Sequence, residues 1–209
     1  GRIVEFDGNK YLIKPDNYSD DIFRKGIRQE YNLGIDGGSD RMQIYASLGY
    51  LKNKGIVYGS DYERISGRLN VRHQARHWLE LGANIAFTHS IGNNSDSSIF
   101  TFLSEMAPIY PLYIRDADGY IMTDENGIMY DYGNSNEAPG LERPLKNASN
   151  PLKDTRLETN NSNSNTFSGH AFADINLTSK LKLSVNLSIV NREYRSTSIR
   201  NPYYGQFAS

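Results

Sequence analysis

Apolar and polar side chains alternate along four consecutive stretches, each of about ten residues, between residues 27 and 91. In the first stretch, Tyr31, Leu33 and Ile35 are separated by polar residues or glycine. Successive side chains of a β-strand point to opposite faces, so this period of two predicts strands with one apolar and one polar face. Gly, Ser, Asp and Asn lie between the stretches, as expected for turns.

Two further strands are predicted over residues 163–195. Leu183, Val185 and Leu187 alternate there with polar residues, and this is the most regular period-two pattern in the chain. The predicted strands divide the chain as follows: a preceding loop or hairpin at 1–26, four strands at 27–91, a long loop at 92–162, two strands at 163–195, and the start of another loop at 196–209.

The long loop at residues 92–162 is rich in Asn, Ser, Asp, Gly and Pro and shows no sustained alternation. Residues 99–106 are apolar enough for a short helix or strand, and a small hairpin is predicted around the turn at residues 116–119. A loop of this length is uncommon in a compact domain. External loops of membrane barrels are often this long, so we expect an extracellular loop with some structure of its own.

The lengths of the five predicted connections alternate. The connections after the first, third and fifth strands are short, and those after the second and fourth are longer. In an up-and-down barrel, alternate connections lie at the same rim, with short turns on one side and long loops on the other. A Greek-key sandwich has no reason to sort its loops in this way. We therefore predict an all-β fold, an antiparallel up-and-down meander of about six strands within a larger transmembrane β-barrel.

Composition agrees with a barrel wall. Mean hydropathy is −0.61 and only 38% of residues are hydrophobic, as expected where one face of each strand is apolar. Arg64, Arg68 and Arg72 share one face of the third strand. Three arginines would be costly in a dry core, so we predict that they line a wet lumen. A net charge of −1 argues against nucleic acid as a partner.

The chain offers no recognisable catalytic or metal-binding motif. It has no cysteine, and no nucleophile elbow or phosphate-binding loop. Asp116 and Asp118 suggest a calcium loop, but Gly119 comes two positions too early for an EF-hand. The histidines lack carboxylates at ligand spacing. We therefore predict that the chain is not an enzyme and holds neither a metal nor a cofactor.

Several segments resemble one family of transporters: YNLGIDGGSD (31–40), IYASLGYLKNKGIV (44–57), SDYERISGRLNV (60–71), HWLELGANIAFTHS (77–90), MAPIYPLYIRDADGYIMTDENG (106–127) and NPYYGQFAS (201–209). Together they are similar to the SusC/RagA family of TonB-dependent outer-membrane transporters. The resemblance implies a large barrel of about 22 strands with an internal plug. It also implies uptake of oligosaccharides or peptides in a Gram-negative outer membrane, with the TonB complex and a SusD-like surface lipoprotein as partners. Six strands cannot close such a barrel, so we expect a fragment.

Tyrosines of the long loop are the candidate contacts for a substrate or a partner. Aromatic faces beside hydrogen-bonding groups suit sugars and peptides. The alternative is that these tyrosines pack a small core of the loop itself or dock the lipoprotein. The candidates are Tyr110, Tyr113, Arg115, Tyr120, Tyr130 and Tyr132.

A soluble, secreted β-sandwich that binds carbohydrate is the second hypothesis for the whole chain. The two hypotheses differ in what covers the apolar face of the last strand, which carries Leu183, Val185 and Leu187. A second sheet would cover it in a sandwich, whereas outer-membrane lipid would cover it in a barrel. An isolated soluble segment would have to curl or self-associate to hide this face.

Overall fold

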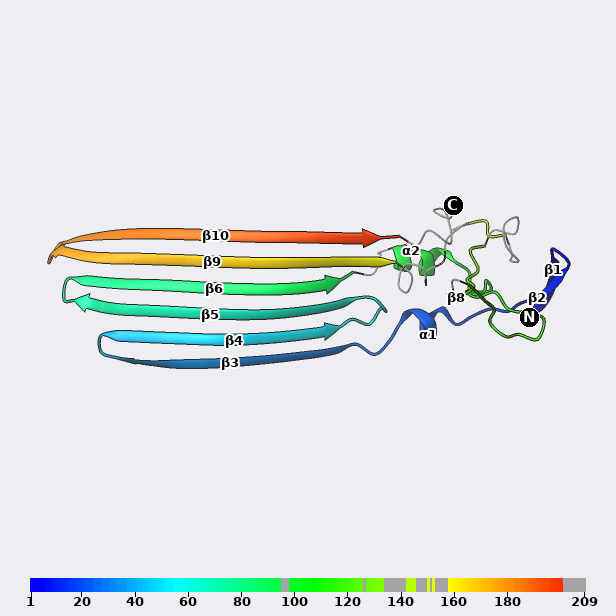
Figure 1. The fold of residues 1–209 in the computed structure, drawn as a ribbon, viewed down its shortest axis with the longest axis horizontal. Coiled ribbons are helices and arrows are strands. Elements are labelled where there is room, and N and C mark those ends of the chain that lie inside the picture. Colours follow the sequence, from blue (N-terminus) through cyan, green and yellow to red (C-terminus); the bar gives the residue numbers. More distant parts are fainter. Residues whose placement is uncertain are drawn as a thin grey trace.

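A computed structural model describes residues 1–94, 98–125, 127–133, 142–145, 150, 152 and 158–200. Its main element is a six-stranded antiparallel sheet with strand order β10-β9-β6-β5-β4-β3, so that strands adjacent in sequence are adjacent in space (Figure 1). This arrangement confirms the predicted meander. The strands are β3 (Ile27–Ser39), β4 (Met42–Lys54), β5 (Asp61–Arg76), β6 (Leu79–Asn93), β9 (Thr159–Thr178) and β10 (Leu181–Ile199).

Several predicted bounds are corrected by the structure. The long connection begins after Asn93 and ends before Thr159, whereas residues 92–162 were expected. The last two strands run from Thr159 to Ile199, beyond the predicted 163–195, so the expected loop at 196–209 begins in strand, and residues 201–209 lie outside the described part. The Asn- and Ser-rich start of β9 pairs with β10 through the backbone. Backbone pairing does not require apolar side chains, so this part of β9 shows no apolar–polar alternation in its sequence.

Short and long connections lie at opposite ends of the sheet, as predicted (Figure 1). Residues 40–41, 77–78 and 179–180 form the short turns at one end. Residues 55–60 and the connection from β6 to β9 lie at the other end. The N-terminal residues that precede β3 enter at this same end, so three connections meet there.

These three connections form what we call the loop domain: residues 1–26, 55–60 and the described residues between 94 and 158. The hairpin of β1 (Arg2–Phe6) and β2 (Asn9–Ile13) turns at Asp7 and Gly8, both with positive φ, as the Asp-Gly pair predicts. The remaining elements are α1 (Tyr18–Ile22), α2 (Ser98–Glu105), β7 (Thr123–Asp124) and β8 (Gly127–Ile128). The predicted hairpin near residue 116 is also present, because Arg115 pairs with Ile121.

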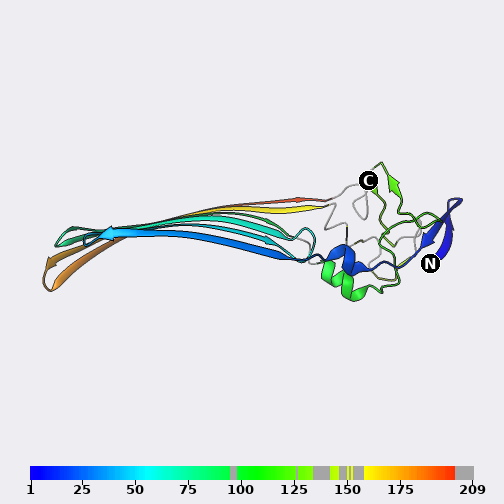
Figure 2. The same ribbon diagram turned by 90° about the horizontal axis from the view of Figure 1, so that it is seen from below.

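The buried apolar core lies in the loop domain, and the sheet is a single open layer (Figure 2). On one sheet face Leu33, Ile35 and Leu187 remain 70%, 69% and 72% exposed. Among the described residues no second sheet covers this face, so neither a sandwich nor the expected curling is found. No helix in the described ranges combines the length and the apolarity needed to cross a membrane.

Candidate functional site

The exposed apolar face runs without interruption across all six strands. The strand register aligns its side chains in rows, because directly paired residues share a face of the sheet. One row crosses the middle of the sheet and consists of Ile35, Ala46, Leu69, Ile85, Gly169 and Ile189. We call this side the outer face and the opposite side the inner face.

The apolar residues of the outer face form a slanted band. On β4 the band covers residues 42–50, and on β10 it covers residues 181–189, nine positions in each strand. Tyr50, at one limit of the band on β4, lies in the same row of paired residues as Glu193 on β10. On β10, however, the band already ends at Ile189, four residues before Glu193. At the other limit, Met42 lies in the same row as Val185, again four residues from the band limit on β10.

If the band matches a flat apolar layer, its slant across the sheet gives the angle between the strands and the normal of that layer. Four residues rise about 14 Å along a strand, and four strand spacings measure about 19 Å. The strands would therefore lie about 35° from the normal of the layer, and the band would be about 22 Å high. Membrane barrels have strands tilted by about 35–45° and an apolar band about 25 Å tall. Aromatic side chains also line one limit of the band, where Tyr31 and Tyr50 stack with ring centroids 6.4 Å apart.

The inner face is polar, and the register brings the three predicted arginines onto it. The Nε atom of Arg72 lies 3.0 Å from Oε1 of Glu80, and Arg64 lies 3.9 Å from Glu30. The row of Arg68 otherwise holds small side chains, including Gly34, Ser47 and Ala86.

Near the short turns the inner face has an open hollow of about 670 Å³ beside Arg72. Its other polar lining residues are Asp36, Ser39, Asp40, Gln43, Tyr45, Asn70 and Asn84. Together these side chains give the inner face a surface that suits water or a hydrophilic solute.

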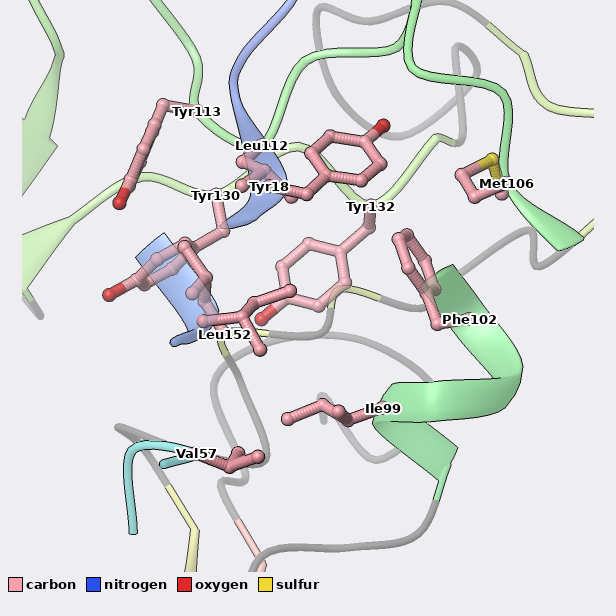
Figure 3. Close-up of a cluster of buried hydrophobic side chains, with 11 residues drawn as sticks. Tyr18, Val57, Ile99, Phe102, Met106, Leu112, Tyr113, Tyr130, Tyr132 and Leu152 are labelled. Atoms are coloured by element: carbon pink, nitrogen blue, oxygen red, sulfur yellow. The ribbon is translucent and has the colours of Figure 1, made fainter. Parts of the chain in front are cut away.

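The predicted tyrosine site divides into buried and exposed residues. Tyr113, Tyr130 and Tyr132 are buried and lie in the core of the loop domain (Figure 3). The rings of Tyr113 and Tyr130 have centroids 5.7 Å apart. These three side chains therefore take the packing role that was the alternative to ligand contact, whereas Tyr120 is 73% exposed. Tyr110 is half-buried, and contact of Tyr110 and Tyr120 with a ligand stays a prediction.

Comparison with known proteins brings these surfaces together. No family model matches the chain. The TonB-dependent receptor SusC of Bacteroides thetaiotaomicron is 25% identical over 198 residues, which cover 90% of this chain and 19% of SusC. The TonB-dependent receptor P39 of Formosa agariphila is 30% identical over 101 residues, which cover 48% of this chain and 10% of P39. The chain thus spans at most a fifth of these relatives.

Solved structures of the RagAB peptide importer share the fold. In its closed-closed state the TM-score is 0.69 at 19% identity, over 98% of this chain and 22% of that chain. In the open-open state the TM-score is 0.65 at 20% identity, over 91% of this chain and 20% of that chain. The open sheet and the loop domain are therefore matched together. The chain is similar in sequence and fold to a segment of a SusC/RagA-type barrel.

A buried ion pair joins the two main parts of the loop domain. Asp16 Oδ1 accepts a hydrogen bond from Arg115 Nη2 at 2.6 Å, and Oδ2 accepts from Nη1 at 3.1 Å. Oδ2 also accepts from the backbone N–H of Leu112 at 2.8 Å. Arg115, predicted as a ligand contact, is 8% exposed and instead ties the N-terminal residues to the long loop.

Two tyrosine hydroxyls strengthen the same junction. Tyr113 donates to Oδ1 of Asp21 at 2.6 Å, and Tyr18 donates to the carbonyl of Tyr110 at 2.6 Å. Burial raises the pKa of Tyr18 to about 12, so its hydroxyl keeps its proton at neutral pH. Sequence reasoning missed Asp16, Tyr18 and Asp21, because nothing local to residues 1–26 indicates contacts more than ninety residues away.

A second polar cluster holds the far side of the loop domain. The carboxylate of Asp131 accepts from Arg143 at 3.0 Å and from the backbone N–H of Gly133 at 2.7 Å. Burial raises the pKa of Asp131, and the nearby Arg143 guanidinium partly offsets this effect. Asn150 donates to the carbonyls of Leu112 and Asp131. These contacts hold together the segments that carry Tyr113, Tyr130 and Tyr132.

Proposed function

We propose that the chain forms part of the wall and the external loops of a TonB-dependent importer in the outer membrane of a Gram-negative bacterium. The observation that carries this proposal is the uncovered apolar band of the outer face, with its equal width on β4 and β10 and its slant of about 35°. A soluble domain would leave a large apolar surface in contact with water, which is unfavourable. Lipid around the barrel would cover the same surface.

The inner face would then line the aqueous lumen, with Arg64, Arg68 and Arg72 on its wall. The loop domain would stand on the external side. We propose oligosaccharides or peptides as substrates, a SusD-like lipoprotein as the surface partner and the TonB complex as the energy source. The SusC relative and the RagAB peptide importer support this assignment. The exposed side chains of Tyr120 and Ile109 offer contacts for the substrate or for the lipoprotein.

Spin labels on adjacent residues of β10 test the membrane assignment in the full-length protein. This segment has no cysteine, so once any cysteine elsewhere in the full-length protein is replaced, single labels can be attached at Leu187→Cys on the outer face and at Ser188→Cys on the inner face. In outer-membrane vesicles we expect Leu187→Cys to be accessible to oxygen and protected from a water-soluble nickel reagent. Ser188→Cys should show the opposite pattern. If both reagents fail to reach Leu187→Cys, the face is covered by protein, as in the sandwich hypothesis.

A separate experiment tests the partner and the substrate. The full-length protein would be purified in mild detergent from its native outer membrane, and co-purifying lipoproteins would be identified by mass spectrometry. Peptide and oligosaccharide mixtures would then be offered to the purified complex. Specific retention of one class would identify the substrate, and retention of neither would contradict the importer assignment.

A further inference from the structure

The strands at one side of the sheet are far longer than a membrane crossing requires. β9 has 20 residues and β10 has 19, whereas a tilted transmembrane strand needs about 9–11. The apolar band ends at Phe167 on β9 and at Ile189 on β10. The remaining residues, 159–166 and 190–199, continue toward the loop domain. At about 3.3 Å per residue and a tilt of about 35°, this extension would rise about 25 Å above the apolar layer.

The two faces of the extension differ in chemistry. The inner face of β9 carries small hydroxyl side chains, Ser162, Ser164 and Thr166. The inner face of β10 carries Arg192 and Tyr194. The outer face is richer in amides, and its hydrogen-bonding residues are Asn161, Asn163, Asn165, Asn191, Glu193, Arg195 and Thr197. His89 Nδ1 lies 2.7 Å from Asn165 Oδ1, and Asn165 donates to Glu193 at 3.4 Å. The outer face thus changes from apolar to amide-rich at the end of the band.

Positive charge accompanies these amides at the same height. Lys52 and Lys54 follow the Tyr50 row on the outer face of β4, and Arg195 lies on β10. Asp61, the register partner of Lys54, instead binds Arg24 at 2.5 Å. Within the described ranges, no carboxylate lies within ion-pair distance of Lys54 or Arg195.

A hollow of about 270 Å³ opens beside the two lysines. Most of its lining comes from the outer face: Lys52, Lys54, Asp61, Glu63, Ile91 and Asn93. Lys52 lies 3.9 Å from Glu63, and Asp61 binds Arg24, so Lys54 is the cation of this lining that has no ion-pair partner among the described residues. A concave site with mixed charges and an amide fits a phosphorylated polyhydroxyl group better than it fits lipid tails.

We propose that this outer surface, which we call the headgroup surface, binds the phosphorylated saccharide headgroup of the glycolipid in the outer leaflet. It is defined by Lys54, His89, Asn161, Asn163, Asn165 and Arg195. The proposal rests on the proposed function, because it requires lipid around the band. The surface continues the lipid-covered face directly, so the group just above the acyl chains is the one it meets. Amides pair with sugar hydroxyls, and the two cations pair with phosphates.

Removal of the two cations tests the proposal in the full-length protein. The double variant Lys54→Gln/Arg195→Gln would be compared with the inner-face control Arg28→Gln/Arg192→Gln. The probe is purified rough-type lipopolysaccharide in phosphatidylethanolamine vesicles, measured as glycolipid retained after extraction in mild detergent. Each surface cation is worth several-fold in affinity for anionic lipid, so we expect a loss of roughly tenfold for the outer variant. The control should retain wild-type levels. Equal retention by the two variants would overturn the proposal.

Photo-crosslinking gives a second readout that does not depend on the stability of the variants. A benzophenone side chain at Asn163 should form an adduct with lipopolysaccharide, and the same group at the adjacent inner-face Ser162 should not. An adduct of Asn163 with a protein, or none at all, would contradict the proposal. The spin labels at Leu187 and Ser188 distinguish failure of the membrane assignment from failure of the headgroup surface alone. If they show lipid and the crosslink is absent, only the headgroup surface is wrong.

Discussion

Asp16 holds the two halves of the loop domain together. Its side chain is 10% exposed and accepts three hydrogen bonds, two of them from the guanidinium group of Arg115. The guanidinium contact is bidentate, and the Leu112 amide gives the carboxylate a third hydrogen bond. A buried pair of this kind contributes little relative to an apolar pair of the same shape. Loss of one partner is costly, because an uncompensated charge then remains buried.

We therefore predict that Arg115→Met destabilises the loop domain by about 3–5 kcal/mol. The Asp16 carboxylate would stay buried without its counterion. Hydrogen exchange in the full-length protein would measure this loss as faster exchange of the Leu112 amide. Asp16→Asn combined with Arg115→Met should recover part of the stability, because no charge is then left alone.

The exposed pair of Arg28 and Glu30 is the matched control for this prediction. Its side chains are 62% and 36% exposed, and the atoms lie 2.7 Å apart. Water screens such a pair, so Arg28→Met should leave the exchange rate of the Leu112 amide close to that of the wild type. If the Leu112 amide exchanged equally fast in Arg115→Met and in Arg28→Met, the Asp16–Arg115 pair would have no special role in stability.

Sequence reasoning at this scale identified aromatic residues of the loop but not their surroundings. Tyr113 and Tyr120 are both followed by isoleucine, yet Tyr113 is buried and Tyr120 is exposed. In a strand, period-two alternation indicates which side chains share a face. A loop has no period, so burial there depends on which distant segment packs against it. Here that segment is residues 1–26.

At the level of elements, β6 and β9 fit together through a glycine and an aromatic ring. A Cβ atom at Gly82 would overlap the ring of its register partner Phe172. The ring of Phe172 lies over Gly82 of β6, where there is no side chain in its way. Aromatic rings often cover glycines of a neighbouring strand in this way. Phe172 also lies 5.8 Å from the guanidinium carbon of Arg72 on the next strand. The ring thus links three strands on the inner face.

We predict that Gly82→Val destabilises the barrel by about 1–3 kcal/mol, because the ring must leave its position. The urea midpoint of the full-length protein in vesicles would measure the change. Gly67→Val is the control, since a Cβ there would lie 3.6 Å from Leu48, an ordinary contact distance. Adding Phe172→Ala to Gly82→Val should restore part of the midpoint. An equal loss from both glycine variants would indicate a general cost of valine instead of a clash.

Alternation predicted where the six strands lie because each strand has one apolar face. It could not predict that β9 begins at Thr159, since the first eight residues of that strand are polar on both faces. Those residues are strand because β10 pairs with them throughout. How far β9 extends beyond the apolar layer is therefore decided by its pairing with β10. The sequence pattern of β9 alone does not show it.

At the level of the whole molecule, the tilt comes from comparing strands that lie four apart. Each strand alone gives the width of its apolar stretch, and the loop lengths give the meander. Neither gives the tilt, because it depends on the register between strands. The structure supplies the register, and the same four-residue shift then appears at both limits of the band.

The tilt makes a prediction about depth in the bilayer. Ala46 and Val185 are the midpoints of the band on β4 and β10, so spin labels at these two positions should lie at equal depth near the centre of the membrane. Ile189 lies in the same row as Ala46. With strands tilted by about 35°, it should nevertheless lie about 11 Å nearer the external surface. The ratio of oxygen to nickel-reagent accessibility in outer-membrane vesicles measures these depths. Equal depths for Ala46 and Ile189 would mean upright strands, and the slant of the apolar band would then have no relation to the membrane.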